Sequence, residues 1–220
     1  MQLAAVTLAR VLAYIETADL NPHGRVFFPE LIRKLVERFE FQKFPTTFEQ
    51  TDEDKGVEFF EGRWNGVTVD KLAIFRAALV LDTSASTSDS ERIINESLTW
   101  AAQECGINYK PGMIKRKQYL SDLTFYSDVR LLDAHAAMVK LQQGITEAAS
   151  AAFGQPLNYN LTHFGLDFDK TVTPLVAAAF SIQRRGNALF SENKYFSEAP
   201  LPTGIHIELL EQFERDLTVQ

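Results

Sequence analysis

Two runs of three consecutive extended segments constrain the fold of this chain more than any other feature. The first run consists of residues 57–64, 67–75 and 78–84. The second run consists of residues 158–169, 175–185 and 188–198. Asn65-Gly66 joins the first two segments and is the dipeptide most typical of a tight β-hairpin. Strands that follow one another without an intervening helix pair antiparallel, so the sequence predicts an α+β fold with a largely antiparallel sheet.

About four amphipathic segments are expected to form helices. They cover residues 28–40, 88–105, 134–153 and 203–217. Ser88 and Glu91 have the spacing of a capping box, which predicts the start of the second helix, and Asp133 is expected to cap the third. Residues 3–17 fit either a strand or one face of a helix, and we favour the strand. With an extended segment at 117–131 they complete the predicted order β-α-βββ-α-β-α-βββ-α.

This order contains a possible internal repeat. Residues 57–105 and 158–217 each read as three strands followed by a helix, although their sequences do not match visibly. Helices would cover one face of the sheet and leave the other to water, a partner or a second layer. A length of 220 residues suits one large domain, so we expect residues 1–220 to form a single α+β domain.

The third predicted helix carries a stripe of apolar and small side chains. The stripe consists of Ala134, Met138, Leu141, Ile145, Ala148 and Ala152. Small side chains allow close approach of a neighbouring element. We therefore expect this stripe to pack against a sheet or another helix.

The charge balance and the cysteine content narrow the class of protein. The chain has 22 basic and 29 acidic residues and a net charge of −7, which argues against nucleic-acid binding. Cys105, the single cysteine, excludes an internal disulfide and is expected to be a small buried hydrophobe. No apolar stretch approaches the roughly 18 residues of a membrane span, and the apolar start lacks the basic region of a signal peptide. We expect a soluble, cytoplasmic protein.

The histidines give one candidate acid–base cluster. His163 lies in an extended segment, and strand alternation places Asp167 and Asp169 on the same face. The four histidines lack metal-ligand spacing, so no metal and no cofactor are expected. His206 falls on the apolar side of the last helix and is interpreted as a core histidine.

A second candidate is the loop from Asp82 to Ser90, which leads from a strand into a helix. The backbone N–H groups at a helix start can bind an anion, and nearby hydroxyls add donors. These hydroxyls belong to Ser86, Thr87, Ser88 and Ser90. Acidic neighbours would repel a phosphate, so a plain capped loop is the interpretation we favour. A hydrolase or nucleotide-acting enzyme would use this loop or His163 with Asp167.

Two short basic runs, Lys115-Arg116-Lys117 and Arg184-Arg185, lie at strand ends. Together with nearby aromatic rings they could follow a nucleic-acid backbone. Runs of this length at strand ends are more often solvated turns, which is the interpretation we favour.

Aromatic side chains supply the leading hypothesis. They are Phe59, Phe60, Trp64, Phe190, Tyr195 and Phe196. Aromatic residues are enriched in the cores of protein interfaces, and strand alternation places Phe59 and Phe60 on opposite faces. The sequence therefore favours a non-catalytic interaction subunit that self-associates or binds a protein partner in a cytoplasmic assembly.

Overall fold

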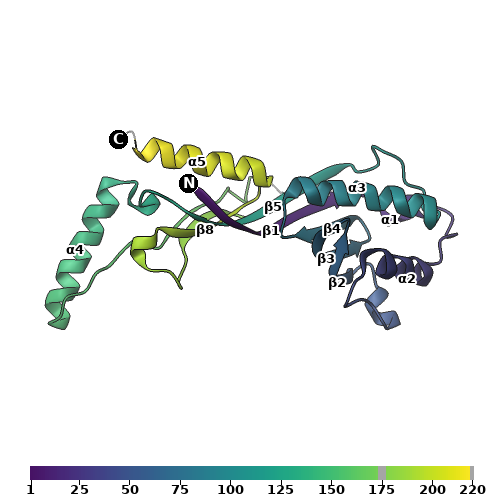
Figure 1. The fold of residues 1–220 in the computed structure, drawn as a ribbon, viewed down its shortest axis with the longest axis horizontal. Helices are drawn as coiled ribbons and strands as arrows, with labels where there is room; N and C mark the ends of the chain where they lie inside the picture. Colours follow the sequence, from purple (N-terminus) through teal and green to yellow (C-terminus); the bar gives the residue numbers. More distant parts are fainter. Residues whose placement is uncertain (173–176, 219–220) are drawn as a thin grey trace. The chain divides into compact units, whose positions relative to one another are not determined.

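A computed structural model describes residues 1–172 and 177–218 and confirms an α+β fold with a largely antiparallel sheet (Figure 1). The strands are β1 Gln2–Tyr14, β2 Val57–Trp64, β3 Val67–Phe75, β4 Ala78–Thr83, β5 Arg116–Tyr126, β6 His163–Leu166, β7 Phe180–Arg184 and β8 Lys194–Ala199. The α-helices are α1 Thr17–Leu20, α2 Phe28–Phe39, α3 Thr87–Glu104, α4 Ala136–Phe153 and α5 Thr203–Thr218. Short 3₁₀ helices η1 Phe48–Thr51, η2 Leu131–Asp133 and η3 Phe190–Glu192 lie in the connections.

The β2–β3 hairpin has the predicted bounds because its turn residues adopt the conformation that the turn requires. Asn65 has φ +46° and Gly66 has φ +86°, both in the left-handed region that these residues tolerate best. Trp64 therefore pairs with Val67 across a two-residue turn.

The eight strands are hydrogen-bonded in the order β2-β3-β4-β1-β5-β8-β7-β6. This order reveals a repeat that is longer than the predicted one. The element order β1-α2-β2-β3-β4-α3 recurs as β5-α4-β6-β7-β8-α5, and the two meanders occupy mirrored places in the strand order. Helix α4 is therefore the topological counterpart of α2.

The chain, expected from its length to form one domain, divides into two compact units. The first unit contains residues 6–122 and 200–206, and the second contains residues 1–5, 123–199 and the chain from 207 onward. In the first unit, α2 and α3 bury their apolar faces against the sheet. Phe39 of α2 lies 4.5 Å from Trp64 of β2, measured between ring centroids.

In the second unit, α5 packs beside β5, and Leu210 of that helix is buried. Glu214 accepts hydrogen bonds from the Ser127 hydroxyl and from the backbone N–H of Asp128, which follow β5. The rings of Phe125 and Tyr195 lie 5.8 Å apart between centroids, and both side chains are buried. The core of this unit is therefore built on β5 and β8.

Several predicted boundaries are wrong. Ser86, not Ser88, caps α3, because its hydroxyl accepts from the Asp89 backbone N–H at 3.1 Å. His135, not Asp133, caps α4, because Asp133 belongs to η2. The strand predicted at 158–169 shrinks to β6, and 188–198 begins with η3 before β8. The segment predicted at 175–185 yields β7, and its residues 175–176 lie outside the described residues.

Candidate interaction surface

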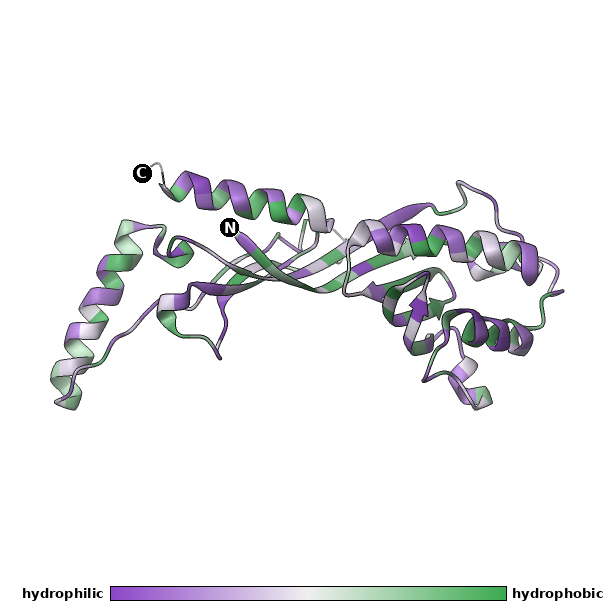
Figure 2. Ribbon diagram, viewed as in Figure 1, coloured by the Kyte–Doolittle hydropathy of each residue, from purple (hydrophilic) through white to green (hydrophobic). Residues whose placement is uncertain are grey.

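Helix α4 is an 18-residue helix without a buried residue. The apolar stripe predicted from the sequence is present but exposed: the exposed fractions of Met138, Leu141 and Ile145 are 44%, 58% and 43%. The charged side chains of the helix, Lys140 and Glu147, lie on the opposite side, about half a turn away. Figure 2 shows the apolar colouring along this helix. We call this surface the α4 face.

The counterpart helix α2 behaves differently. Its stripe residues Ile32, Leu35 and Phe39 have exposed fractions of 8%, 5% and 0%. They pack on the outer strands of their own meander, where Phe59 is fully buried. Both helices have the periodicity of an amphipathic helix, so periodicity does not explain why one stripe is covered and the other is open.

Of the strands that correspond to the ones beneath α2, the outer strand β6 is exposed, whereas β7 is partly covered and its Ile182 is buried. Phe164 and Leu166 of β6 have exposed fractions of 43% and 57%. Their partners across the strand pair are Ile182 and Phe180 of β7, which point to the same face. The rings of Phe164 and Phe180 meet edge to face at 6.4 Å between centroids. We call this surface the β6–β7 strip.

Strand β6 lies at one end of the strand order. The backbone N–H of Arg184 donates to the carbonyl of Thr162, which sets the alternation of hydrogen-bonded pairs along β6. The backbone groups of His163 and Gly165 therefore point away from β7, toward the edge. Such an edge is a template for a further strand unless something covers it.

The segment that leads from α4 to β6 is fastened to α4. The backbone N–H of Leu157 donates to the Ser150 hydroxyl at 2.9 Å, and the N–H of Tyr159 donates to the Thr146 hydroxyl at 3.1 Å. Thr146 and Ser150 lie on a side of the helix other than the α4 face. These bonds hold the connecting segment along α4 without covering its apolar stripe.

The predicted acid–base cluster is not assembled into a hydrogen-bonded set. Asp167 forms an ion pair with Lys170 at 3.0 Å, and this ammonium lowers the pKa of the Asp167 carboxyl. Asp169 accepts from the Thr171 hydroxyl at 2.6 Å, which lowers the pKa of Asp169. His163 is in β6, and both carboxylates follow the end of that strand. Each carboxylate therefore binds a residue within three positions of it in the chain.

Polar side chains of the loop from Asp82 to Ser90 form hydrogen bonds and an ion pair within the chain. Both carboxylate oxygens of Asp82 accept from Arg10 at 2.7 Å. The Ser90 hydroxyl donates to the Ala9 carbonyl at 2.9 Å, and the Thr87 hydroxyl accepts from the Thr203 backbone N–H at 2.9 Å. Ser86 caps the helix, as described above, and Ser88 lies in its first turn. The loop fastens β1, β4 and α3 together.

The basic runs pair with neighbours in the chain. Lys117 forms an ion pair with Glu91, and the Arg116 guanidinium lies 4.2 Å from the centre of the Tyr14 ring. Arg184 and Arg185 lie over aromatic rings of Phe190 and Phe196 respectively. Lys115 is exposed, 3.9 Å from acidic side chains.

The six aromatic residues of the predicted interface differ in burial. Phe59, Trp64 and Tyr195 are enclosed by the chain's own side chains. Phe60 and Phe196 are half-buried, and Phe190 is exposed beneath Arg184. Exposed apolar side chains also occur together on α4 and β6, at residues that the aromatic count did not single out.

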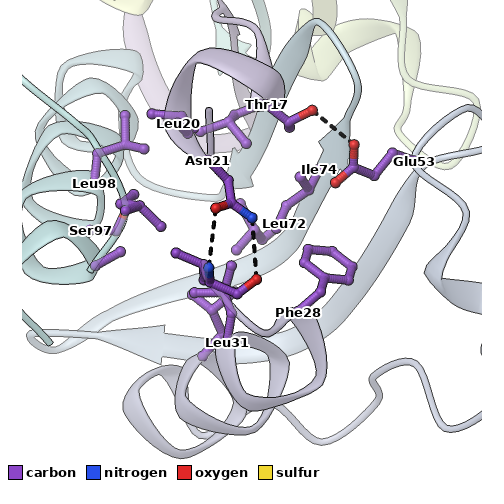
Figure 3. A pocket seen from close by; sticks show the side chains of 15 residues that line it. Thr17, Leu20, Asn21, Phe28, Leu31, Glu53, Leu72, Ile74, Ser97 and Leu98 are labelled. Carbon is purple, nitrogen blue, oxygen red and sulfur yellow. Dashed lines mark hydrogen bonds between the residues drawn. The ribbon is translucent and has the colours of Figure 1, made fainter. Parts of the chain in front are cut away.

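One cavity of about 100 Å³ lies in the first unit between α2, α3 and the sheet. Leu31, Leu72 and Leu98 are among its lining side chains (Figure 3). Thr17 donates to Glu53 at 2.8 Å beside it, and the Asn21 amide is satisfied by backbone groups. Ligand sites usually have about 300–1,000 Å³, so this cavity has the size of a gap in core packing.

No protein-family model matches this sequence, and no curated protein matches it significantly. Within residues 1–172 and 177–218, no three His, Cys, Asp or Glu side chains gather as they would around a metal ion. No helix in the same part of the chain is long and apolar enough to cross a bilayer.

Two further side chains were expected to be buried, His206 and Cys105. His206 is the expected core histidine: its Nδ1 lies 2.8 Å from the Ser121 hydroxyl, and burial lowers its pKa to about 4. Cys105 is half-buried at the C-terminal end of α3, and burial raises the pKa of its thiol. A raised pKa keeps the thiol protonated and makes it a poor nucleophile.

Proposed function

We propose that this protein is a non-catalytic interaction subunit that self-associates through the α4 face and the β6–β7 strip, within a cytoplasmic assembly. The observation that carries the proposal is the exposure of the α4 stripe, since the same position in the repeat is buried on α2. Exposed apolar patches of this kind in a folded chain mark interaction sites.

A second copy is a better occupant than a membrane surface. Helices that lie on membranes carry several Lys or Arg residues on their polar face, whereas α4 has one Lys and one Glu. The whole chain has a net charge of −7, so its copies repel each other over most of their surface. The α4 face lacks charged side chains, and it is therefore a place where two copies can meet at low electrostatic cost.

The energy available is of the size that association needs. Complete burial of a Leu, Ile, Met or Phe side chain contributes about 1.5–3 kcal/mol relative to exposure. Met138, Leu141, Ile145, Phe164 and Leu166 are each roughly half exposed, so covering all five contributes about 4–7 kcal/mol. A two-fold dimer has two such sets, or about 8–15 kcal/mol, against an association cost of about 4–15 kcal/mol. We expect a concentration-dependent dimer.

Light scattering coupled to size-exclusion chromatography tests the proposal with a matched pair of variants. Leu141→Glu places a charge on the α4 face, and Gln143→Glu places the same charge on an exposed position outside it. We expect the wild type and Gln143→Glu to dimerise alike and Leu141→Glu to remain monomeric. A wild type that is monomeric at high concentration, or a Leu141→Glu variant that dimerises normally, would refute it.

The alternative, a hydrolase or nucleotide-acting enzyme, stays a prediction of the sequence. It would use the Asp82–Ser90 loop or His163 with Asp167, whose polar groups have the local partners described above. Thermal-shift screening against nucleotides and metal ions tests it, and stabilisation by several degrees would support it.

A further inference from the structure

We propose that self-association occurs by reciprocal exchange, in which α4 of each copy covers the β6–β7 strip of the other. This inference rests on the proposed function, and it specifies that the α4 face of one copy contacts the β6–β7 strip of the other. It is carried by the internal repeat, in which α2 shows what a helix at this position covers.

The repeat identifies the missing contact. In the first unit, α3 lies beside β4 near the centre of the strand order, and α2 covers the outer strand β2. In the second unit, α5 takes the place of α3, beside β5. The outer strand β6, which corresponds to β2, has four exposed residues. The helix that would cover it by analogy is α4, whose own apolar face is open.

The connection between α4 and β6 explains why the contact is made with another copy. Residues 157–159 run along α4, held by Ser150 and Thr146, and only three residues separate Tyr159 from His163 at the start of β6. An extended residue spans at most about 3.6 Å. The fastened segment therefore continues into β6, which leaves α4 beyond the beginning of the strand and not over its face. Figure 1 shows α4 extending away from the strands of this unit.

One contact accounts for both surfaces. The α4 face contributes the side chains of its apolar stripe and the β6–β7 strip contributes four, and a two-fold contact brings both sets of each copy together. Pairing of α4 with α4 alone would offer fewer residues and would leave Phe164 and Leu166 exposed. The exchanged arrangement covers both open surfaces with one two-fold symmetric contact.

The charges are compatible with this contact. Lys140 and Glu147 cancel on α4, β6 carries no acidic or basic side chain apart from His163, and Arg184 is the charged residue of β7. The guanidinium of Arg184 already lies 4.3 Å from the centre of the Phe190 ring. The α4 face and the four residues of the β6–β7 strip carry no charged side chain, so the surfaces that meet place no like charges opposite each other.

Crosslinking between differently sized chains tests the exchange. In a Cys105→Ser background, one chain carries Ala148→Cys on the α4 face, and a second, tagged chain carries Leu166→Cys on β6. The two chains are co-expressed, and a bismaleimide reagent is added. A Gln143→Cys chain, with its cysteine outside the α4 face, replaces the Ala148→Cys chain as the control.

We expect the pair with cysteines at positions 148 and 166 to form a mixed crosslinked dimer in higher yield than the control pair or either chain alone. A dimer in light scattering that crosslinks only between two copies of position 148 would overturn the exchange and preserve self-association. A chain carrying both cysteines that remains monomeric and links within itself would overturn both proposals, since α4 would then cover its own strip. A monomer without any such link would overturn both as well.

Discussion

The burial of His206 predicts a specific dependence of stability on pH. The imidazole is fully enclosed, and its pKa falls to about 4, against 6.5 for an exposed histidine. The Ser121 hydroxyl donates to the Leu201 carbonyl at 3.0 Å, so it accepts from Nδ1–H of the ring; burial lowers the pKa of His206 by more than this bond raises it. Between pH 6.5 and pH 4, the unfolded chain therefore binds a proton at this residue and the folded chain does not.

The sign and the size of this pH dependence follow from the linkage between proton binding and folding. A group that binds its proton more tightly in the unfolded chain contributes stability at high pH, which is lost as the pH falls through the unfolded pKa. For a pKa of 6.5 in the unfolded chain and about 4 in the folded chain, lowering the pH from 7 to 5 costs about 2 kcal/mol. The full loss, reached below pH 4, is about 3 kcal/mol.

Urea unfolding at pH 7 and pH 5 measures this cost. The comparison is with His206→Gln, which keeps a polar group near Ser121 and cannot titrate. We expect the free energy of unfolding of the wild type to fall by about 2 kcal/mol more than that of the variant between the two pH values. Equal pH dependence in both proteins would show that this imidazole does not titrate between the two states as argued.

Three further substitutions test packing and pairing in the first unit. Gly62→Ala should destabilise the fold by about 1–3 kcal/mol in urea unfolding, because a Cβ at this position overlaps the ring of Phe41; an unchanged midpoint would contradict it. Ala101→Leu, which fills the cavity of about 100 Å³, should raise the thermal midpoint, since empty core volume costs about 24 cal/mol per Å³; a fall would show that the cavity is too tight. Arg10→Ala should lower the free energy of unfolding by about 2–3 kcal/mol, because it leaves buried Asp82 without its ion-pair partner. The double variant with Asp82→Ala should lose less; an equal loss would show that the unpaired carboxylate is not the cause.

The sequence determined much of the local structure of this protein. Asn65-Gly66 accommodates positive φ angles, so its hairpin and the bounds of β2 and β3 could be predicted. The spacing of apolar residues likewise predicted α2 and α4, and the apolar setting of His206 predicted its burial. Such features depend on residues that are close together in the chain, whose conformational preferences act before any long-range contact forms.

Choices between chemically similar neighbours were decided by tertiary structure. Ser86 and Ser88 are both followed three residues later by an acidic residue, and the packing of α3 on the sheet selected Ser86 as the cap. The alternation that grouped His163 with Asp167 and Asp169 required a long strand, but β6 ends at Leu166 because pairing with β7 covers only four residues. A period of two predicts faces and cannot predict where pairing ends.

The burial of the two helices α2 and α4 also could not be predicted from the sequence. An apolar stripe on a helix indicates that the helix has something to cover, and both α2 and α4 carry such a stripe. Only the three-dimensional structure decided that the α2 stripe lies against β2 while the α4 stripe is exposed and residues 157–159 are bound to another side of α4. The physical reason is that burial is a property of pairs of surfaces, and a linear sequence specifies each surface without specifying which one it meets.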